Sequence, residues 1–246
     1  MIQPIIKKGI DLTQAEIEEL DQIYLLSNPK MPKDHIKINH IEKTNPVFFL
    51  YKVEGKIAAF QAYTSFKKKT PFHKKKIPVI YLNLSYKNPE ADKYIKNFAK
   101  TSNLAFIKMT FGRFWFLKKF VMVFQTYNPK LIERISAFFA KAYPNYYEQT
   151  PKEVQRFSQF FFKEELKLPD TIIDKNLVKQ ENYTSLSDIT DKWEQMYNSQ
   201  NPHRNNFFFE NDIIQNKEDQ FFLTGKALFF VGFFSIWPLL YKKLLN

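Results

Sequence analysis

Residues 120–139 read FVMVFQTYNPKLIERISAFF. The first part is apolar and rich in β-branched and aromatic residues, which predicts a strand, and an amphipathic helix pattern begins at an Asn-Pro pair (128–129). Residues 77–87, IPVIYLNLSYK, run into a second Asn-Pro pair (88–89) in the same way. A helix start leaves backbone N–H groups without partners, and these groups favour an anionic or polar ligand. Two such joins in one small sheet predict a ligand-binding α/β domain.

The composition excludes several classes of site. The chain has 246 residues, 44% of them hydrophobic, which is enough for one large domain or for a domain with an appendage. Cysteine is absent, so disulfides, thiolate metal sites and cysteine nucleophiles are excluded. The four histidines are scattered, and His35 and His40 lack the i,i+4 spacing that would place them on one helix face. We therefore expect no metal site.

The charge leaves the partner open. The formal net charge is +12, and part of the excess lies in two lysine runs at 67–69 and 74–76. Such runs either hold phosphates, nucleic acid or an anionic membrane, or are solvated loops. Because no motif for reading nucleic acid accompanies them, we expect no nucleic-acid partner.

The two ends of the chain bear on location. The N-terminal residues show no signal-peptide pattern, so we expect a cytoplasmic protein. Residues 227–240, ALFFVGFFSIWPLL, are shorter than the ~20 apolar residues that span a bilayer, and Pro238 interrupts them. This segment is expected to be a buried element; the alternative is peripheral membrane contact through residues 227–246.

Local signals place the other elements. Thr13 and Glu16 form a capping box that starts a helix ending near residues 27–29. A hairpin is predicted for residues 46–66, with Glu54-Gly55 as its turn.

Later elements follow from similar patterns. The helix after the Asn-Pro pair at 88–89 is predicted to stop near Ser102-Asn103, and residues 104–110 are predicted as a strand. Residues 151–166 and 191–197 are predicted to be helical. In the helix after Pro129, the residues expected to face inward are Leu131, Ile135, Phe138 and Phe139.

The expected order is helix, helix, hairpin, long third strand, helix, strand, helix, and it resembles the GNAT superfamily of acyl-CoA N-acyltransferases. The hairpin of residues 47–66 matches the centre of that fold, residues 77–85 its fourth strand, and residues 121–139 its fifth strand and following helix. The resemblance covers residues 1–147, which are expected to form a GNAT-like domain, with 148–246 as a helical, aromatic extension packed on it. It implies an α/β (α+β) fold with a mixed, mostly antiparallel sheet and helices on both faces.

The resemblance implies an acyl-CoA co-substrate, either acetyl-CoA or a longer acyl-CoA. In that fold the fourth and fifth strands splay apart, and the pantetheine pairs with the fourth strand in the gap. The pyrophosphate sits on the next helix start. The cofactor-binding residues implied here are Leu84, Ser85, Tyr86, Lys87, Asn88, Ala91, Lys93 and Asn128. Here the chain departs from the family, because residues 88–93 (NPEADK) lack the usual glycines and include two acidic residues.

The resemblance also implies acyl transfer from a thioester to a small amine or an amino-acid-like acceptor. A backbone N–H of the fourth strand would polarise the thioester carbonyl. Tyr127 and Tyr143 are the candidate general acids for the departing thiolate, and Asn83 is the candidate for ordering a water. For Asn128 the alternative is a helix cap alone, and for the two tyrosines it is packing. The alternative function is a non-catalytic binding or membrane-peripheral protein of the same fold that has lost the pyrophosphate loop.

Overall fold

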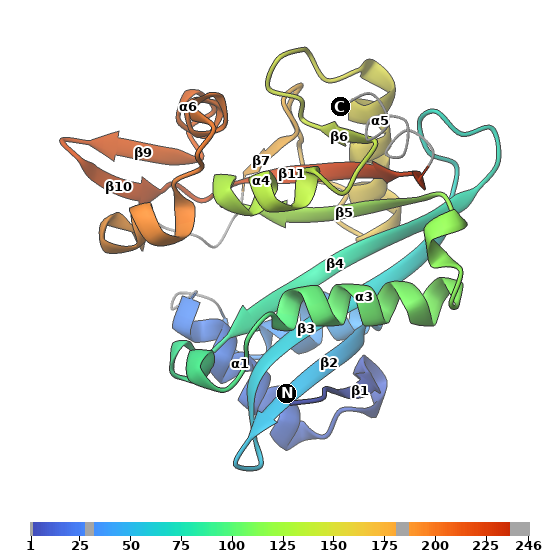
Figure 1. Cartoon of the computed structure of the whole chain (residues 1–246), viewed down its shortest axis with the longest axis vertical. Helices are drawn as coiled ribbons and strands as arrows, with labels where there is room; N and C mark the ends of the chain where they lie inside the picture. The colour runs from blue at the N-terminus through green and yellow to red at the C-terminus, as the bar shows by residue number, and fades with distance from the viewer. Residues whose placement is uncertain (1, 28–31, 181–186, 237–246) are drawn as a thin grey trace. The chain divides into compact units, whose positions relative to one another are not determined.

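The structure is a computed structural model that describes residues 2–27, 32–180 and 187–236 (Figure 1). Its contacts divide the chain into two compact units. Unit 1 comprises Met1–Phe66 and Ile80–Trp115, and unit 2 comprises Lys67–Val79 and Phe116–Asn246. The expected boundary at residue 147 stays a prediction.

The sheet of unit 1 is built around the predicted hairpin. Its strands, in the order β1-β2-β3-β4, are β1 (Ile5–Lys8), β2 (Val47–Val53), β3 (Lys56–Lys68) and β4 (Ile77–Lys87). The last two residues of β3 and the first three of β4 belong to unit 2. β2 pairs antiparallel with both β1 and β3. The turn between β2 and β3 is tight, because Glu54 and Gly55 both have positive φ, 52° and 82°, as a two-residue hairpin turn requires. The hairpin prediction is confirmed.

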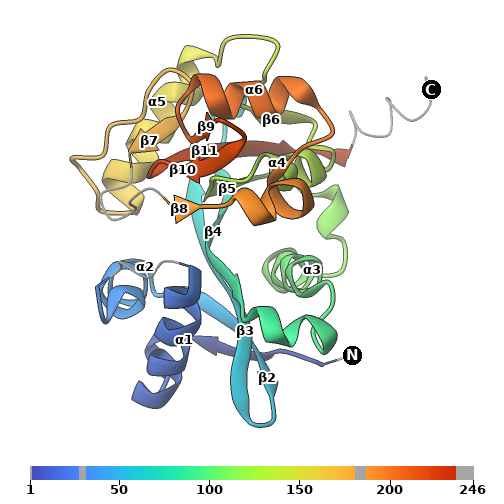
Figure 2. The same ribbon diagram turned by 90° about the vertical axis from the view of Figure 1, so that its left-hand side faces the viewer.

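Helices cover both faces of this sheet. They are η1 (Gly9–Asp11), α1 (Gln14–Ser27), η2 (Lys37–Ile41), α2 (Glu42–Thr44), η3 (Pro89–Lys93) and α3 (Phe98–Phe111). Figure 2 shows α1 and α2 on one side of β2, β3 and β4, and α3 on the other. On the α1 side Leu20 and Ile23 pack with Leu50 and Phe60 in a fully buried cluster. The expected α/β class with a mostly antiparallel sheet is confirmed.

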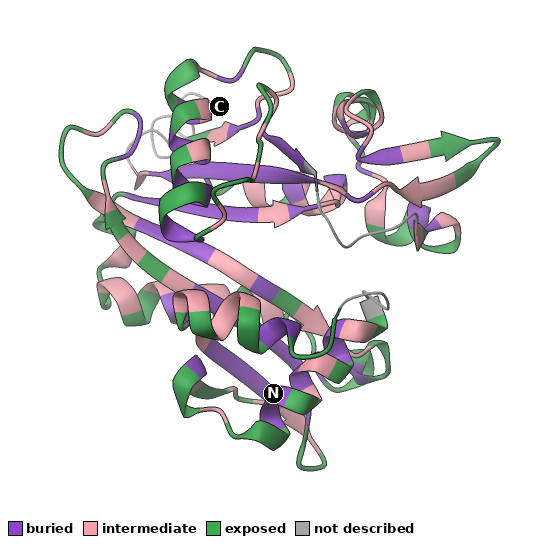
Figure 3. Cartoon of the chain, turned by 180° about the vertical axis from the view of Figure 1, so that it is seen from behind, coloured by how far each residue is buried: buried purple, intermediate pink, exposed green. Residues whose placement is uncertain are grey.

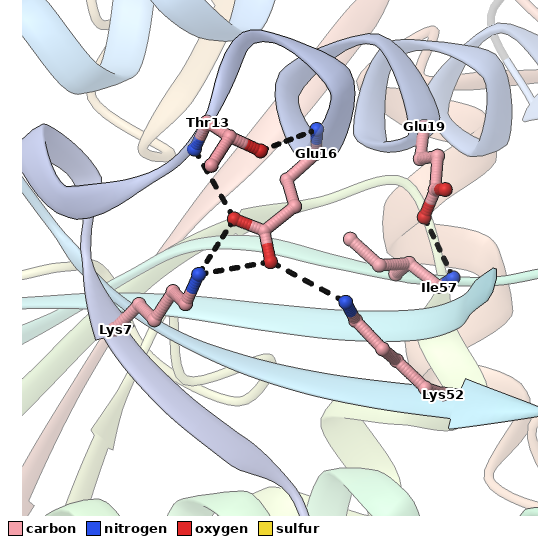
Figure 4. Close-up of polar contacts among 6 residues, drawn as sticks. All are labelled: Lys7, Thr13, Glu16, Glu19, Lys52 and Ile57. Carbon is pink, nitrogen blue, oxygen red and sulfur yellow. Dashed lines mark hydrogen bonds and ion pairs between the residues drawn. The ribbon is translucent and has the colours of Figure 1, made fainter. Parts of the chain in front are cut away.

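The start of α1 is fixed by the predicted capping box (Figure 4). The Glu16 backbone N–H donates to Thr13 Oγ1 at 3.2 Å, and the Thr13 N–H donates to Glu16 Oε2 at 3.1 Å. The same carboxylate also accepts from Lys7 Nζ at 2.8 Å and Lys52 Nζ at 3.4 Å. Burial alone would raise the pKa of Glu16, but the bonds from Lys7, Thr13 and Lys52 outweigh it and lower the pKa to about 2.

The predicted strand at residues 104–110 is wrong, because α3 continues through it to Phe111. The polar pair expected to end the helix instead faces the sheet. Ser102 is fully buried with its Oγ 2.7 Å from the Tyr51 hydroxyl, and Asn103 Oδ1 lies 2.7 Å from the Tyr63 hydroxyl. The helix ends at Gly112, whose φ of 75° is easily adopted only by glycine.

In the main sheet of unit 2, two strands that are far apart in the sequence are paired. β5 (Phe120–Thr126) pairs antiparallel with β11 (Lys226–Phe234), which pairs on its other side with β6 (Lys141–Tyr143) and β7 (Val178–Gln180). A smaller antiparallel sheet has the order β8 (Ser187–Asp188), β10 (Gln220–Leu223) and β9 (Ile214–Lys217). Figure 3 shows that β5 and β11 are largely buried.

The expected burial of the late apolar segment is confirmed for its described part. Residues 227–234 are all buried. Gly232 allows the Phe139 ring to lie directly on the strand, since a Cβ there would come within 2.7 Å of the ring. Residues 237–246 lie outside the described part of the chain.

The helices of unit 2 are η4 (Trp115–Leu117, which begins in unit 1), α4 (Pro129–Ser136), α5 (Lys152–Phe160), η5 (Phe161–Glu165), η6 (Thr190–Lys192), η7 (Trp193–Tyr197) and α6 (Pro202–Glu210). The helical predictions for residues 151–166 and 191–197 are confirmed. The inward face predicted after Pro129 is wrong in part, because Phe138 is 62% exposed whereas Ile132 is buried. α4 ends at Ser136, so the helical spacing no longer applies to Phe138.

Candidate functional site

The helix start expected after Asn88 does not have free backbone N–H groups for a ligand. Asn88 Oδ1 accepts from the Glu90 N–H at 3.0 Å, and its backbone oxygen accepts from the Ala91 N–H at 2.9 Å. Pro89 has no N–H. The capped element, η3, has only five residues, and the long helix α3 begins at Phe98. The first N–H groups of this turn are therefore bonded within the turn itself.

The charges at this place also disfavour an anion. The Lys87 ammonium forms an ion pair with Asp92 and lies 5.6 Å from the centre of the Phe98 ring. Lys93 is exposed, with its ammonium 4.8 Å from the centre of the Tyr94 ring. The backbone donors are used and Lys87 is paired, so these residues do not fit the pyrophosphate of acyl-CoA.

The middle of β4 carries an irregularity. Asn83 Oδ1 accepts from Thr64 Oγ1 at 3.2 Å, and Asn83 Nδ2 donates to Thr44 Oγ1 of α2 at 2.9 Å. Leu84, the next residue, is buried in the cluster on the α1 side, and Tyr86 packs against the same cluster. Consecutive residues of a regular strand point to opposite faces, so two neighbours on one face indicate a β-bulge. A bulge interrupts the ladder and re-aims backbone N–H groups.

A hydrogen-bonded network connects β4 to the α3 side of unit 1. Gln61 Nε2 donates to Ser85 Oγ at 2.8 Å, and the Tyr63 hydroxyl lies 2.6 Å from Gln61 Oε1 and 2.7 Å from Asn103 Oδ1. A hydroxyl donates one proton, and Gln61 Nε2 is already used on Ser85, so Asn103 must present its NH₂ group to Tyr63. Burial raises the pKa of Tyr63 well above 10, so the phenol stays protonated. Because Ser85 Oγ accepts from Gln61, its own proton can be donated to a ligand.

A cavity of about 510 Å³ opens beside Asn88, within unit 1. Its walls come from α1, from the β2–β3 turn and from η3. The lining residues are Glu19, Gln22, Ile23, Leu26, Val53, Glu54, Lys56, Ile57, Ala58, Asn88, Glu90, Ala91, Lys93 and Tyr94. Three residues predicted to bind the cofactor, Asn88, Ala91 and Lys93, are therefore brought together on one wall.

In unit 2, Asn128 acts as the predicted helix cap. Its Oδ1 accepts from the Leu131 N–H at 3.0 Å, and its Nδ2 donates to the Met196 carbonyl at 2.9 Å. Lys130 Nζ donates to the carbonyls of Glu194 and Gln195, at 3.2 and 3.0 Å. The start of α4 thus meets the carbonyl groups of η7. A role for Asn128 in binding a cofactor stays a prediction.

The predicted catalytic residues are divided between the units. Asn83 lies in unit 1, and Tyr127 and Tyr143 lie in unit 2. Tyr127 is half-buried. Tyr143 is buried beside the rings of Phe72 and Phe233, whose centres lie 6.3 and 6.2 Å from its own. Burial raises the pKa of Tyr143, which keeps its phenol protonated.

Sequence reasoning missed the network and the carboxylate of Glu19 in the cavity wall. The network did leave a signal, since Gln61 is a polar residue two positions from Tyr63 in a mostly apolar strand, on the same face. A buried glutamine needs partners, and Gln61 is 1% exposed. Glu19 left no such signal, because it looks like any other solvated residue of α1.

We expect Asn128→Ala to destabilise unit 2 by about 1–2 kcal/mol, because the cap of α4 and the bond to Met196 are both lost. Chemical unfolding with urea measures the loss. Asn128→Asp is the matched variant: it keeps the acceptor for Leu131 and replaces the donor to Met196 by a carboxylate oxygen, whose negative charge the start of α4 stabilises, so its effect should be smaller. Equal effects for the two variants would contradict the assignment of the cap.

No helix in residues 2–27, 32–180 or 187–236 is both long enough and apolar enough to span a bilayer. Within the same described ranges, no three His, Asp or Glu side chains gather closely enough to hold a metal ion.

No family model and no curated protein matches the chain. Among solved structures, it is similar to a conserved protein of unknown function from Enterococcus faecalis V583, described as a probable N-acyltransferase (11% identity, TM-score 0.39). That match covers 58% of this chain and 33% of the other, so the chain spans about a third of its length.

Two further similar structures are acetyltransferases. One is from Trypanosoma brucei (11% identity, TM-score 0.34, covering 44% of this chain and 77% of that one). The other is a GNAT family acetyltransferase from Elizabethkingia anophelis with acetyl-CoA bound (10% identity, TM-score 0.32, covering 94% and 97%). Of the three, the last is described as a member of the GNAT family, which the sequence resembles. Likenesses at this level do not assign an activity to the chain.

Proposed function

We propose that the chain is an N-acyltransferase, which moves an acyl group from a thioester to an amine. The observation that supports it is the bulge at Asn83-Leu84 in β4, because a bulge leaves backbone N–H groups that can donate to a developing oxyanion. The hydroxyl of Ser85, oriented by Gln61, is a second donor beside the bulge. Asn83 uses both ends of its amide on Thr44 and Thr64, so we assign it to holding the bulge rather than to ordering water.

In this reaction the amine lone pair attacks the thioester carbonyl, the C–S bond breaks, and a thiolate and a proton leave. The amine must be unprotonated when it attacks, and positioning supplies much of the rate. Tyr127 and Tyr143 remain the proposed donors of a proton to the thiolate. Tyr127 is the better candidate of the two, because it is half-buried whereas Tyr143 is buried.

The test is release of free thiol from acetyl-CoA and longer acyl-CoAs in the presence of a panel of primary amines. We expect release that depends on the amine, with mass spectrometry showing the amide product. Because no residues here fit the pyrophosphate, a donor without it should react almost as well. We expect S-acyl-pantetheine to be a substrate with a kcat/KM within about threefold of that of acyl-CoA. Ser85→Ala should lower kcat about tenfold, and Ser65→Ala on β3 is the control. No thiol release from any donor at millimolar concentration would refute the proposal.

The second candidate is a non-catalytic binding protein of the same fold. It is favoured by the state of η3, whose N–H groups are bonded internally. Such a protein would bind a ligand, measured by titration calorimetry, without releasing thiol. Membrane contact through residues 227–234 is not part of this candidate, because these residues form a buried strand between β5 and β6.

A further inference from the structure

We propose that the cavity beside Asn88 binds a small organic cation, namely a protonated amine with an apolar body. The cavity measures about 510 Å³, which is in the range of sites that take metabolite-sized ligands. Every residue that lines it belongs to unit 1, so the site needs no other part of the chain. Neither the acyl-transfer reaction nor its donor enters into this inference.

The charged residues of the cavity favour a cation. Three acidic residues line it, from three different elements: Glu19 from α1, Glu54 from the hairpin turn and Glu90 from η3. Two basic residues, Lys56 and Lys93, also line the cavity. The balance is therefore negative in a chain whose formal net charge is +12. A cleft with a surplus of negative charge raises the local concentration of cationic ligands.

One of the carboxylates is held in place. Glu19 Oε2 accepts from the Ile57 N–H at 2.8 Å, so the hairpin fixes the position of this side chain (Figure 4). A carboxylate has about four lone-pair sites, and one bond to a backbone N–H leaves the others for a ligand. An ammonium group has three N–H donors and fits this arrangement. A phosphate does not, because the backbone donors of η3 are already used.

The remaining walls supply an apolar surface. Ile23, Ile57 and Ala91 are buried side chains at the cavity, and the Tyr94 ring is 48% exposed at its edge. An alkyl or aromatic body can pack on the first three residues. The ring of Tyr94 can contribute a cation–π contact, as it already does with Lys93.

This site is separate from the proposed place of reaction. Asn88, at the cavity, follows Ser85, the nearer of the two proposed oxyanion donors, by three residues, and three residues of strand extend about 10 Å. A small amine in the cavity is therefore held away from these donors. It acts there as a bound effector.

The experiment uses the full chain and two probes, phenethylamine and 1,5-diaminopentane, titrated at pH 7 by calorimetry and by backbone amide NMR. 3-Phenylpropanoate and inorganic pyrophosphate are the anionic counterparts. We expect the amines to bind, with shifts centred on the amides of Ile57 and Ala91, and both anions to bind at least about tenfold more weakly.

The variants Glu54→Gln and Glu90→Gln each should weaken amine binding about fivefold, and the double variant more than tenfold. Both side chains are exposed, so folding should be unaffected, and thermal unfolding checks this. Glu18→Gln, an exposed residue of α1 outside the cavity, should leave the affinity unchanged. Three results would overturn the proposal: no amine binding at 20 mM (about the weakest affinity worth assigning), tighter binding of pyrophosphate, or an unchanged affinity in the double variant.

Discussion

Phe230→Ala is expected to lower the free energy of unfolding by about 3–5 kcal/mol. Phe230 in β11 is fully buried, and its ring centre lies 4.7 Å from that of Phe124 and 5.6 Å from that of Phe139. Truncation removes the packing of the ring and leaves a cavity that the paired strands cannot close. Urea unfolding followed by circular dichroism measures the change.

Phe138→Ala is the matched control, because the same substitution then removes a ring that is 62% exposed. Its cost should stay below about 1 kcal/mol. Similar costs for Phe138 and Phe230 would contradict both the burial of β11 and the corrected inward face after α4.

Glu16→Gln is expected to cost about 2–3 kcal/mol at pH 7. Glutamine can still accept from the Thr13 N–H, so the capping box is largely kept. What is lost is the charge that faces Lys7 and Lys52, whose ammonium groups then lie beside a neutral amide. Thermal or urea unfolding measures the loss. Glu18→Gln, on the exposed side of α1, should cost less than about 0.5 kcal/mol.

The pH dependence provides a second measurement of the same interaction. The folded-state pKa of Glu16 is about 2, below its ordinary value of 4.5. A depressed pKa contributes stability that is complete above pH 4.5 and is lost as the pH falls toward 2. The Glu16→Gln chain should therefore lose less stability than the natural chain between these two pH values. Parallel stability curves for the two chains across this range would contradict the assignment.

The elements that could be predicted from the sequence are those fixed by neighbouring residues. The turn at Glu54-Gly55 and the cap at Asn128 need only a few adjacent residues to form. The length of α3 could not be read in this way. Ser102 and Asn103 look like a helix stop, but tyrosines about 40 to 50 positions earlier in the chain satisfy their polar groups.

For the candidate site, the sequence identified the right region of β4 but not its chemistry. Asn88-Pro89 correctly predicted a cap, but the sequence did not indicate that η3 stops at Lys93 or that α3 begins only after Asn97, which has a left-handed φ of 56°. The bulge at Asn83 depends on a partner in α2, Thr44, and that contact has no local pattern. The strand partners of β11 could not be predicted either, because an apolar segment does not indicate which strand of a sheet it will pair with.

The position of β11 has a consequence for biosynthesis. The ladder of β5 pairs residue 126 with residue 228, about a hundred positions later in the chain. During translation, β5 therefore emerges well before the strand that covers it, and in the interval an apolar edge with unpaired N–H and C=O groups remains open. A nascent chain in this state is prone to aggregate through this strand edge. The yield of folded protein should therefore depend on chaperones that bind the exposed edge until Phe234 has been synthesised.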